Sequence, residues 1–408
     1  MKKMWEKWTG ISLVKRIIAG LAIGVILALV LPRASGIGIL GDVFVGALKA
    51  IAPLLVFFLV MSSLSNAGKS HGGVIRTVII LYMFSTVLAS VIAVFASMIF
   101  PVDMVLQEAA DTAASAPQGI VEVLSTLLMN VVANPVSALV NANYIGILSW
   151  AVLLGVAFRG AKDTTKAALA DIAEGISKVV TTIINLAPLG ILGLVYTSVT
   201  TSGLETFTVY GRLLILLVGC MLGIYFVTNP VLVYWCIRKN PYPLIFKCLK
   251  QSAITAFFTR SSAANIPVNM KICEEMGLDK DTYSVTIPLG ATINMDGAAI
   301  TITVMTMATV HTLGIPVDIP TAIVLSLLAA LAACGASGVA GGSLLLIPMA
   351  CSLFGIPDEV SMQVVAVGFI IGVIQDSVET ALNSSSDLLL SASAEFRQWR
   401  LQGKEIRF

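Results

Sequence analysis

The chain has 408 residues, of which 57% are hydrophobic and 12% are charged, and its mean hydropathy is +0.94. Soluble domains carry about 25% charged residues, so this composition excludes an ordinary soluble protein and predicts a polytopic membrane protein. A net charge of +2 is too small to indicate a nucleic acid or another polyanionic partner. The six cysteines form no CxxC pair and the two histidines stand alone, so neither redox chemistry nor a metal cage is supported.

The apolar segments predict eight membrane spans. Lys2, Lys3 and Lys7 precede the first of them, and because no small-residue cleavage site follows, we expect a retained span instead of a signal peptide. At about 20 residues per crossing, the spans are expected near 11–32, 43–66, 75–100, 143–159, 175–200, 209–237, 283–310 and 361–390.

Two further apolar segments are interrupted by polar or glycine-rich residues. The first, near 244–270, is broken by Thr259-Arg260-Ser261-Ser262, and the second, near 320–356, is broken by residues 334–343. Each is interpreted as two half-spans that enter and leave the membrane on one side. A merely kinked helix is the alternative for the second segment.

The distribution of basic residues favours this re-entrant interpretation, because cytoplasmic loops carry the excess of Lys and Arg. Reading either broken segment as a full crossing would place basic loops outside. With both termini in the cytoplasm, the cytoplasmic segments contain Lys69, Arg76, Arg159, Lys162, Lys166, Arg238, Lys239, Lys247, Lys250, Lys271, Lys280, Arg397, Arg400, Lys404 and Arg407.

Each broken segment is followed by a span with internal polar residues, so the two form an inverted repeat, as in secondary transporters that bind their substrate near the membrane midplane. The last span carries the densest polar stripe. Asp376, Thr380, Asn383 and Asp387 are separated by four, three and four residues and therefore share one helix face. Ionisable groups at this depth normally face a cavity or a partner. Polar contacts between packed helices are the alternative explanation.

Four motifs in this order resemble the dicarboxylate/amino acid:cation symporter family, which includes the glutamate transporters. Within that family, the chain is most similar to the bacterial sodium/serine-threonine symporters. The resemblance covers the C-terminal half, and the N-terminal spans agree in number and order. The motifs are Thr259-Arg260-Ser261-Ser262-Ala263-Ala264, Asn294-Met295-Asp296-Gly297-Ala298, Gly338-Val339-Ala340-Gly341 and the segment 376–387.

The resemblance implies a substrate site for a zwitterionic amino acid. In this interpretation Asp387 binds the amino group, while Asn383 and the Ser261-Ser262 turn bind the carboxylate. Thr380 lines the pocket and the Gly338-Val339 backbone closes over it. Arg260 balances charge by pairing with Glu379 or with Asp376, and the sequence leaves both partners open.

Position 379 departs from the family pattern, because members with acidic substrates carry an arginine there that binds the side-chain carboxylate. Here the residue is Glu379. A carboxylate at this point would repel aspartate and glutamate and would leave their second carboxylate unpaired. We therefore expect serine and threonine as substrates.

The resemblance implies sodium as the coupling ion, with no other cofactor. The sequence offers the oxygen ligands that this hard cation prefers, without a dedicated histidine or thiolate. Asn294 and Asp296 are the central candidates, and Met295 lies between them. The resemblance adds three groups of ligands. They are Tyr82, Ser85 and Thr86; the Gly290 and Asn383 carbonyls with the Asp387 carboxylate; and carbonyls near Thr292, Ala333, Cys334 and Ala336.

The expected fold is an all-α membrane protein with eight transmembrane helices and two inverted re-entrant hairpins. Residues 1–240 are expected to form mainly a scaffold, although span 3 contributes to the transport core. Residues 241–395 are expected to form that core, and residues 396–408 a cytoplasmic tail. By analogy with the family, the assembly is a homotrimer in the cell (inner) membrane and the core moves as an elevator.

The sequence is compatible with three alternative functions. A proton- or sodium-coupled symporter of aspartate, glutamate or C4-dicarboxylates would share the fold. An ion channel would also place polar turns at the midplane. Gly335-Ala336-Ser337-Gly338 resembles the GxSG of intramembrane serine proteases, but no histidine follows His311 to act as its base, so an enzyme is not expected.

Overall fold

The structure is a computed structural model that describes residues 8, 10–66, 73–106, 125, 128–336 and 341–406. Within these residues every regular element is helical and no strand occurs. The elements are α2 (Leu13–Val30), η1 (Ser35–Ile37), α3 (Ile39–Asn66), α4 (Gly73–Ile99), α6 (Pro135–Val140), α7 (Tyr144–Ala157), η2 (Phe158–Gly160), α8 (Asp163–Asn185), α9 (Ala187–Ser202), α10 (Thr206–Gly223), η3 (Ile224–Thr228), α11 (Asn229–Ile237), α12 (Tyr242–Cys248), η4 (Leu249–Ala253), α13 (Ile254–Thr259), α14 (Ser262–Glu275), α15 (Lys280–Ile293), α16 (Asp296–Thr312), α17 (Ile319–Ala333), η5 (Gly342–Leu346), α18 (Ile347–Ser352) and α19 (Asp358–Leu401).

The all-helical prediction is confirmed for the described residues, and several helices are long and apolar enough to cross a membrane. Five meet both conditions, and the bent pair α8 and α9 is a sixth candidate. The segment predicted at 143–159 corresponds to α7, which has 14 residues. The count of eight spans with two re-entrant hairpins stays a prediction.

Two of the predicted spans are interrupted in the structure. The span expected at 175–200 consists of α8 and α9, which meet at Leu186 with a bend of 51°. The side chain of Arg16 fixes this bend, because it donates to the Asn185 carbonyl at 3.1 Å and to the Asn185 side chain at 3.0 Å. The span expected at 283–310 is broken at Asn294 and Met295, between α15 and α16.

The first broken segment folds back on itself. The helical run from Tyr242 ends at Thr259, Arg260 takes a left-handed conformation with φ 52°, and Ser261 caps α14 by accepting from the Ala264 amide. The two arms are joined by a buried polar cluster, in which Asn265 donates to Ser252 at 3.0 Å and Ser252 donates to Asn269 at 2.6 Å. The break therefore separates two packed helical arms.

In the second broken segment, α17 ends with Cys334 as its C-cap, and the chain re-enters the described residues at Gly341, which has φ +71°. The short helices η5 and α18 follow, and all of their residues except Ser352 are buried. Gly342 lies against the other arm, since an added Cβ there would be 2.6 Å from the Ala336 carbonyl oxygen. Residues 337–340, which include the predicted contacts Gly338 and Val339, lie outside the described residues.

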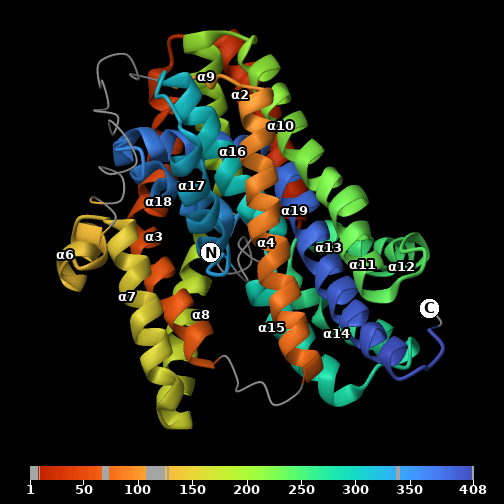
Figure 1. The fold of residues 1–408 in the computed structure, drawn as a ribbon. Coiled ribbons are helices and arrows are strands. Elements are labelled where there is room, and N and C mark those ends of the chain that lie inside the picture. Colours follow the sequence, from red (N-terminus) through yellow and green to blue (C-terminus); the bar gives the residue numbers. More distant parts are fainter. Residues whose placement is uncertain are drawn as a thin grey trace.

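The central element is α19, a helix of 44 residues that packs against α4, α10, α11, α13, α14, α15 and α16. In Figure 1, α19 and α16 lie between the group α6, α7 and α8 on one side and α11 and α12 on the other. Because helices surround it, the polar stripe of α19 is enclosed by protein.

Candidate functional site

The predicted polar stripe of α19 lies inside the protein. Asp376, Glu379, Thr380, Asn383 and Asp387 are all buried, with at most 7% of their surface exposed. Asp376 and Asp387 are 11 residues apart, which corresponds to about 16 Å along a helix with a rise of about 1.5 Å per residue. The two carboxylates therefore belong to different surroundings.

Asp376 lies where the two broken segments meet. Its Oδ2 accepts a hydrogen bond from Arg260 Nε at 2.6 Å, and its Oδ1 accepts from the Gly341 amide at 3.1 Å. The structure thus assigns the partner of Arg260, which the sequence had left open between Glu379 and Asp376. The Nη1 atom of Arg260 is buried and has no hydrogen-bond partner in the structure.

A cavity of about 10 Å³ adjoins Arg260, Gly341 and Asp376. Its other walls come partly from the N-terminal helices, through Leu13, Ile17, Ile184 and Ala187, and partly from Leu344, Phe369 and Gly372. A space of this size holds about one water molecule. An amino acid can occupy this position only after one of the surrounding groups moves.

Glu379 is held by three donors on three different parts of the fold. Its Oε2 accepts from Thr301 on α16 at 2.7 Å, from Ser343 on η5 at 2.9 Å, and from Gln375 one turn earlier on α19. Gln375 also donates to the Thr301 hydroxyl at 2.8 Å. These three donors could not be predicted from the sequence, because single hydroxyl and amide groups in apolar helices usually serve packing.

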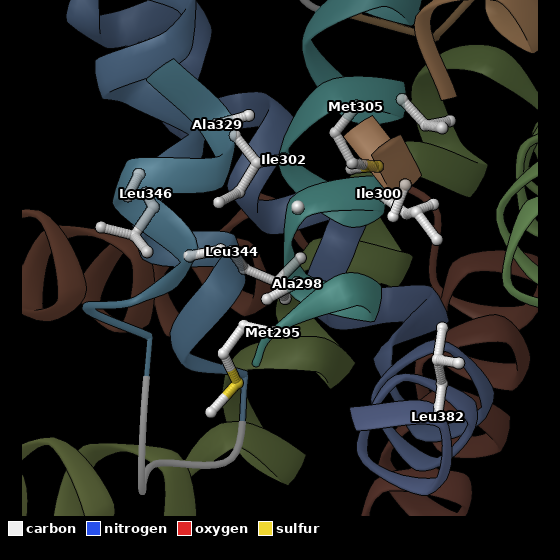
Figure 2. Packing of buried hydrophobic residues seen from close by; sticks show 14 of the residues in the cluster. Met295, Ala298, Ile300, Ile302, Met305, Ala329, Leu344, Leu346 and Leu382 are labelled. Atoms are coloured by element: carbon white, nitrogen blue, oxygen red, sulfur yellow. The ribbon is translucent and has the colours of Figure 1, made fainter. Parts of the chain in front are cut away.

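Asn383 caps the first turn of α16. Its Oδ1 accepts from the Gly297 amide at 2.7 Å, and its Nδ2 lies 3.4 Å from the sulfur of Met295. Only glycine fits at position 297, because an added Cβ would lie 2.9 Å from Glu379 Cα. Figure 2 shows Met295 and Ala298 at this start of α16, with Leu344 of η5 beside Ala298.

The first predicted group of sodium ligands is assembled around Asp296. Ser85 donates to Asp296 Oδ2 at 2.7 Å, and Thr86 donates to Asp296 Oδ1 at 3.0 Å. The Thr86 hydroxyl also accepts from the Met295 amide at 3.2 Å. Residues from α4 and from the break between α15 and α16 are therefore brought together. Tyr82, which was expected in the same group, donates to the Asp387 carbonyl instead. The binding of sodium by these residues stays a prediction.

The second predicted group surrounds Asp387. Its Oδ1 accepts from Asn294 Nδ2 at 2.9 Å, and its backbone carbonyl accepts from the Tyr82 hydroxyl at 2.8 Å. Gly290 is in direct contact, because an added Cβ there would be 2.8 Å from Asp387 Oδ1. The structure connects this group to the first one through Asn294, which precedes Asp296 by two residues.

The third predicted group lies where α15 and α17 end. Cys334 Sγ lies 3.7 Å from the Ile293 carbonyl oxygen, which brings the residue after Thr292 next to the end of α17. The Ala333 carbonyl accepts from the Ala336 amide at 2.9 Å. The carbonyls expected to act together are therefore near each other, and their binding of sodium stays a prediction.

Two buried oxygens in these groups are free to accept a ligand. Asp387 Oδ2 and Asn294 Oδ1 have no hydrogen-bond partner in the structure. Among the ion pairs of the described residues, none involves Asp296 or Asp387. Oxygen atoms of carboxylate, amide and hydroxyl groups suit a hard cation, so the residues present fit Na⁺.

Comparison with known proteins shows the family to which the chain belongs. The model of the sodium:dicarboxylate symporter family matches residues 13–395. The serine/threonine transporter SstT of Bifidobacterium adolescentis is 57% identical over 400 residues, which cover 98% of this chain and 93% of that relative. The chain therefore belongs to the sodium:dicarboxylate symporter family and is an integral membrane transporter.

Proposed function

We propose that the protein imports serine and threonine together with sodium. The observation that carries the sodium coupling is the presence of two buried carboxylates, Asp296 and Asp387, without a basic partner among the described residues. An unpaired buried anion is unfavourable by several kcal/mol, so a bound cation would stabilise both groups. The substrates are those named for the relative that is 57% identical over nearly the whole chain.

The roles of the two ends of the polar stripe follow from their contacts. Asp376 lies with Arg260 and Gly341, which belong to the two broken segments, whereas Asp387 lies with Asn294, Tyr82 and Gly290. We therefore assign the substrate's amino group to Asp376 and a sodium ion to Asp387. This differs from the sequence prediction, which gave the amino group to Asp387.

The substrate's carboxylate needs donors near Asp376. Arg260 supplies one, because its Nη1 is buried and has no hydrogen-bond partner. The Ser261 and Ser262 turn and Asn383 stay candidates from the sequence, as does Thr380 for the pocket wall. When the substrate's amino group binds Asp376, Arg260 would exchange the carboxylate of Asp376 for that of the substrate and would remain paired.

The selection of neutral side chains is assigned to Glu379. This carboxylate lies one turn from Asp376 on the same helix face, so a substrate bound at Asp376 would direct its side chain toward a negative charge. A second carboxylate on the substrate would be repelled there. A hydroxyl or methyl group would not.

For the whole molecule we propose eight transmembrane helices and two re-entrant hairpins, with both termini in the cytoplasm. Residues 1–240 would form mainly the scaffold, with α4 joined to the transport core of residues 241–395. The homotrimer and the elevator motion are expected by analogy with the family. The contacts of Ser85 and Thr86 with Asp296 support the assignment of α4 to the core.

The alternative within the same family is a symporter of aspartate or another dicarboxylate. The buried, unpartnered Nη1 of Arg260 favours it, because a guanidinium group can bind a second carboxylate. Transport assays separate the two functions.

Uptake of labelled serine, threonine and aspartate into proteoliposomes tests the proposal, with a sodium gradient, a proton gradient or neither. We expect sodium-driven uptake of serine and threonine. Asp376→Asn should abolish serine binding, whereas Asp387→Asn should mainly weaken the response to sodium. Aspartate uptake, or serine uptake driven by protons alone, would contradict the proposal.

A further inference from the structure

We propose that a groove between α4 and α10 binds an anionic phospholipid of the surrounding bilayer. The phosphate group would bind Arg212, and one acyl chain would fill the groove. The two helices pack against each other, and α4 and the helical run that begins with α10 are both long and apolar enough to cross a membrane. The site contains none of the residues assigned to serine or sodium, so the inference goes beyond the proposed function.

The groove is a cavity of about 720 Å³. Its walls come from within residues 92–102, at the end of α4, and from within residues 212–223 of α10. Arg212 is the one charged side chain among the described residues that line it. Three of the lining side chains, Ile99, Phe100 and Ile215, are largely exposed. The groove therefore opens on the outer surface of the helices, where a membrane protein meets acyl chains.

Two glycines of α10 keep the groove open. Gly219 and Gly223 are four residues apart and so share one helix face, and a Cβ added at either would meet no atom within 4 Å. Small residues at this spacing usually allow a second membrane helix to pack closely. Here no described part of the chain fills the space, and an unfilled apolar surface loses its dispersion contacts. In a bilayer an acyl chain supplies them.

Arg212 is a charged residue inside a membrane-spanning helix. It follows Thr206, the first residue of α10, by six residues, which corresponds to about 9 Å along the helix. Its side chain is exposed, and none of the ion pairs of the described residues involves it. An arginine near the end of a membrane helix extends its guanidinium group toward the headgroups, where it can bind a phosphate group through two hydrogen bonds. The positive charge therefore favours an anionic headgroup.

The length of the groove fits one acyl chain. Arg212 and Gly223 are 11 residues apart, which corresponds to about 16 Å along α10. The hydrocarbon core of a bilayer is about 30 Å thick, so one leaflet contributes about 15 Å. A phospholipid with its phosphate group at Arg212 would thus end near Gly223, at the middle of the membrane. The proposed topology places the start of α10 outside, so this lipid belongs to the outer leaflet.

Lipid binding by the purified protein tests the site. The protein in a mild detergent is titrated with dioleoyl phosphatidylglycerol and, separately, with dioleoyl phosphatidylcholine, and bound lipid is counted by native mass spectrometry. The two lipids have the same acyl chains and differ in the net charge of the headgroup. One basic residue near the headgroups contributes about 1 kcal/mol to the binding of an anionic lipid, so we expect about fivefold tighter binding of phosphatidylglycerol.

Variants of the charge and of the groove separate the two parts of the site. Arg212→Gln should lower the affinity for phosphatidylglycerol about fivefold or more, to that for phosphatidylcholine, whereas Arg212→Lys keeps the charge and should keep the preference. Gly219→Leu places a side chain in the groove and should weaken the binding of both lipids, because the acyl chain loses its place. If Arg212→Gln lowers the yield of folded protein, Gly219→Leu still tests the site.

Arg33→Gln and Gly175→Leu are the matched controls. Arg33 is exposed just after α2, Gly175 is exposed on α8 with no atom within 4 Å of an added Cβ, and neither lines the groove. Both controls should bind the lipids as the unaltered protein does. Thermal unfolding without added lipid shows whether each variant is folded.

Equal affinities for the two lipids would overturn the proposal. Unchanged binding in both Arg212→Gln and Gly219→Leu would do the same, as would an equal loss in Arg33→Gln, which would indicate a general effect of surface charge. Inorganic phosphate should not displace the lipid, because it leaves the apolar groove unfilled; displacement would show that the anion alone is recognised. Since the experiment measures no transport, a failure of this site leaves the proposed function untouched.

Discussion

Removal of one hydroxyl group next to Asp296 should weaken sodium binding. In the structure Ser85 donates to Asp296 Oδ2 at 2.7 Å, and Thr86 donates to Asp296 Oδ1 at 3.0 Å. Ser85→Ala therefore removes one of the two side chains that bind this carboxylate. Ser90→Ala is the control, because Ser90 lies on the same helix, is equally buried, and pairs with Thr303 instead.

The magnitude follows from the kind of bond that is lost. A hydrogen bond to a charged group contributes about 1.5–3 kcal/mol. If the same oxygen binds the ion with at least this energy, the sodium concentration for half-maximal uptake should rise about tenfold to a hundredfold. Ser90→Ala removes a bond between two neutral hydroxyl groups and should change this concentration by less than about threefold.

The assay is uptake of labelled serine into proteoliposomes over a series of sodium concentrations at constant ionic strength. Thermal unfolding of each purified variant shows whether the fold is intact. Equal shifts for Ser85→Ala and Ser90→Ala would show that the effect is general packing. No shift for Ser85→Ala would refute the assignment of Asp296 as part of a sodium site.

Three further predictions concern the surroundings of the site. Gly297→Ala places a Cβ against the backbone of Glu379 and should destabilise the protein by about 1–3 kcal/mol. Gly219→Ala is the control, because a Cβ added at Gly219 meets no atom within 4 Å, and equal thermal midpoints for the two variants would contradict the prediction. Arg16→Ala removes the hydrogen bonds to the end of α8 and should lower the free energy of unfolding by about 2 kcal/mol or more. Lys15→Ala is the control, because Lys15 is exposed, and thermal unfolding of both variants tests the difference. Glu379→Arg should admit aspartate in competition uptake, and continued exclusion of aspartate would show that charge at this position does not select the substrate.

The sequence predicted the helical class and the approximate positions of the long helices, because hydropathy reports burial in a membrane directly. It placed helix ends less well. The last span was expected at 361–390, whereas α19 runs from Asp358 to Leu401, since its charged ends lower the hydropathy without ending the helix. The bend at Leu186 had a local signal in Pro188, which fits the first turn of α9 and disfavours one continuous helix.

The grouping of the candidate ion ligands in space was easier to predict from the sequence than the contacts around Asp376, and their binding of sodium stays a prediction. Asn294 and Asp296 were recognisable because amide and carboxylate groups are rare at membrane depth. The choice of Asp376 as the partner of Arg260 needed the structure, because Glu379 lies on nearly the same helix face. Ser343 and Thr301 were missed, since their contact with Glu379 spans 36 and 78 residues and has no local pattern.

The coupling of the amino acid to sodium is tested most directly by calorimetric titration of the purified protein with serine at low and at high sodium, with potassium keeping the ionic strength constant. Since coupling between two ligands is reciprocal, sodium that neutralises Asp296 and Asp387 should raise the affinity for serine by at least about tenfold. The same affinity for serine in both solutions would contradict the account.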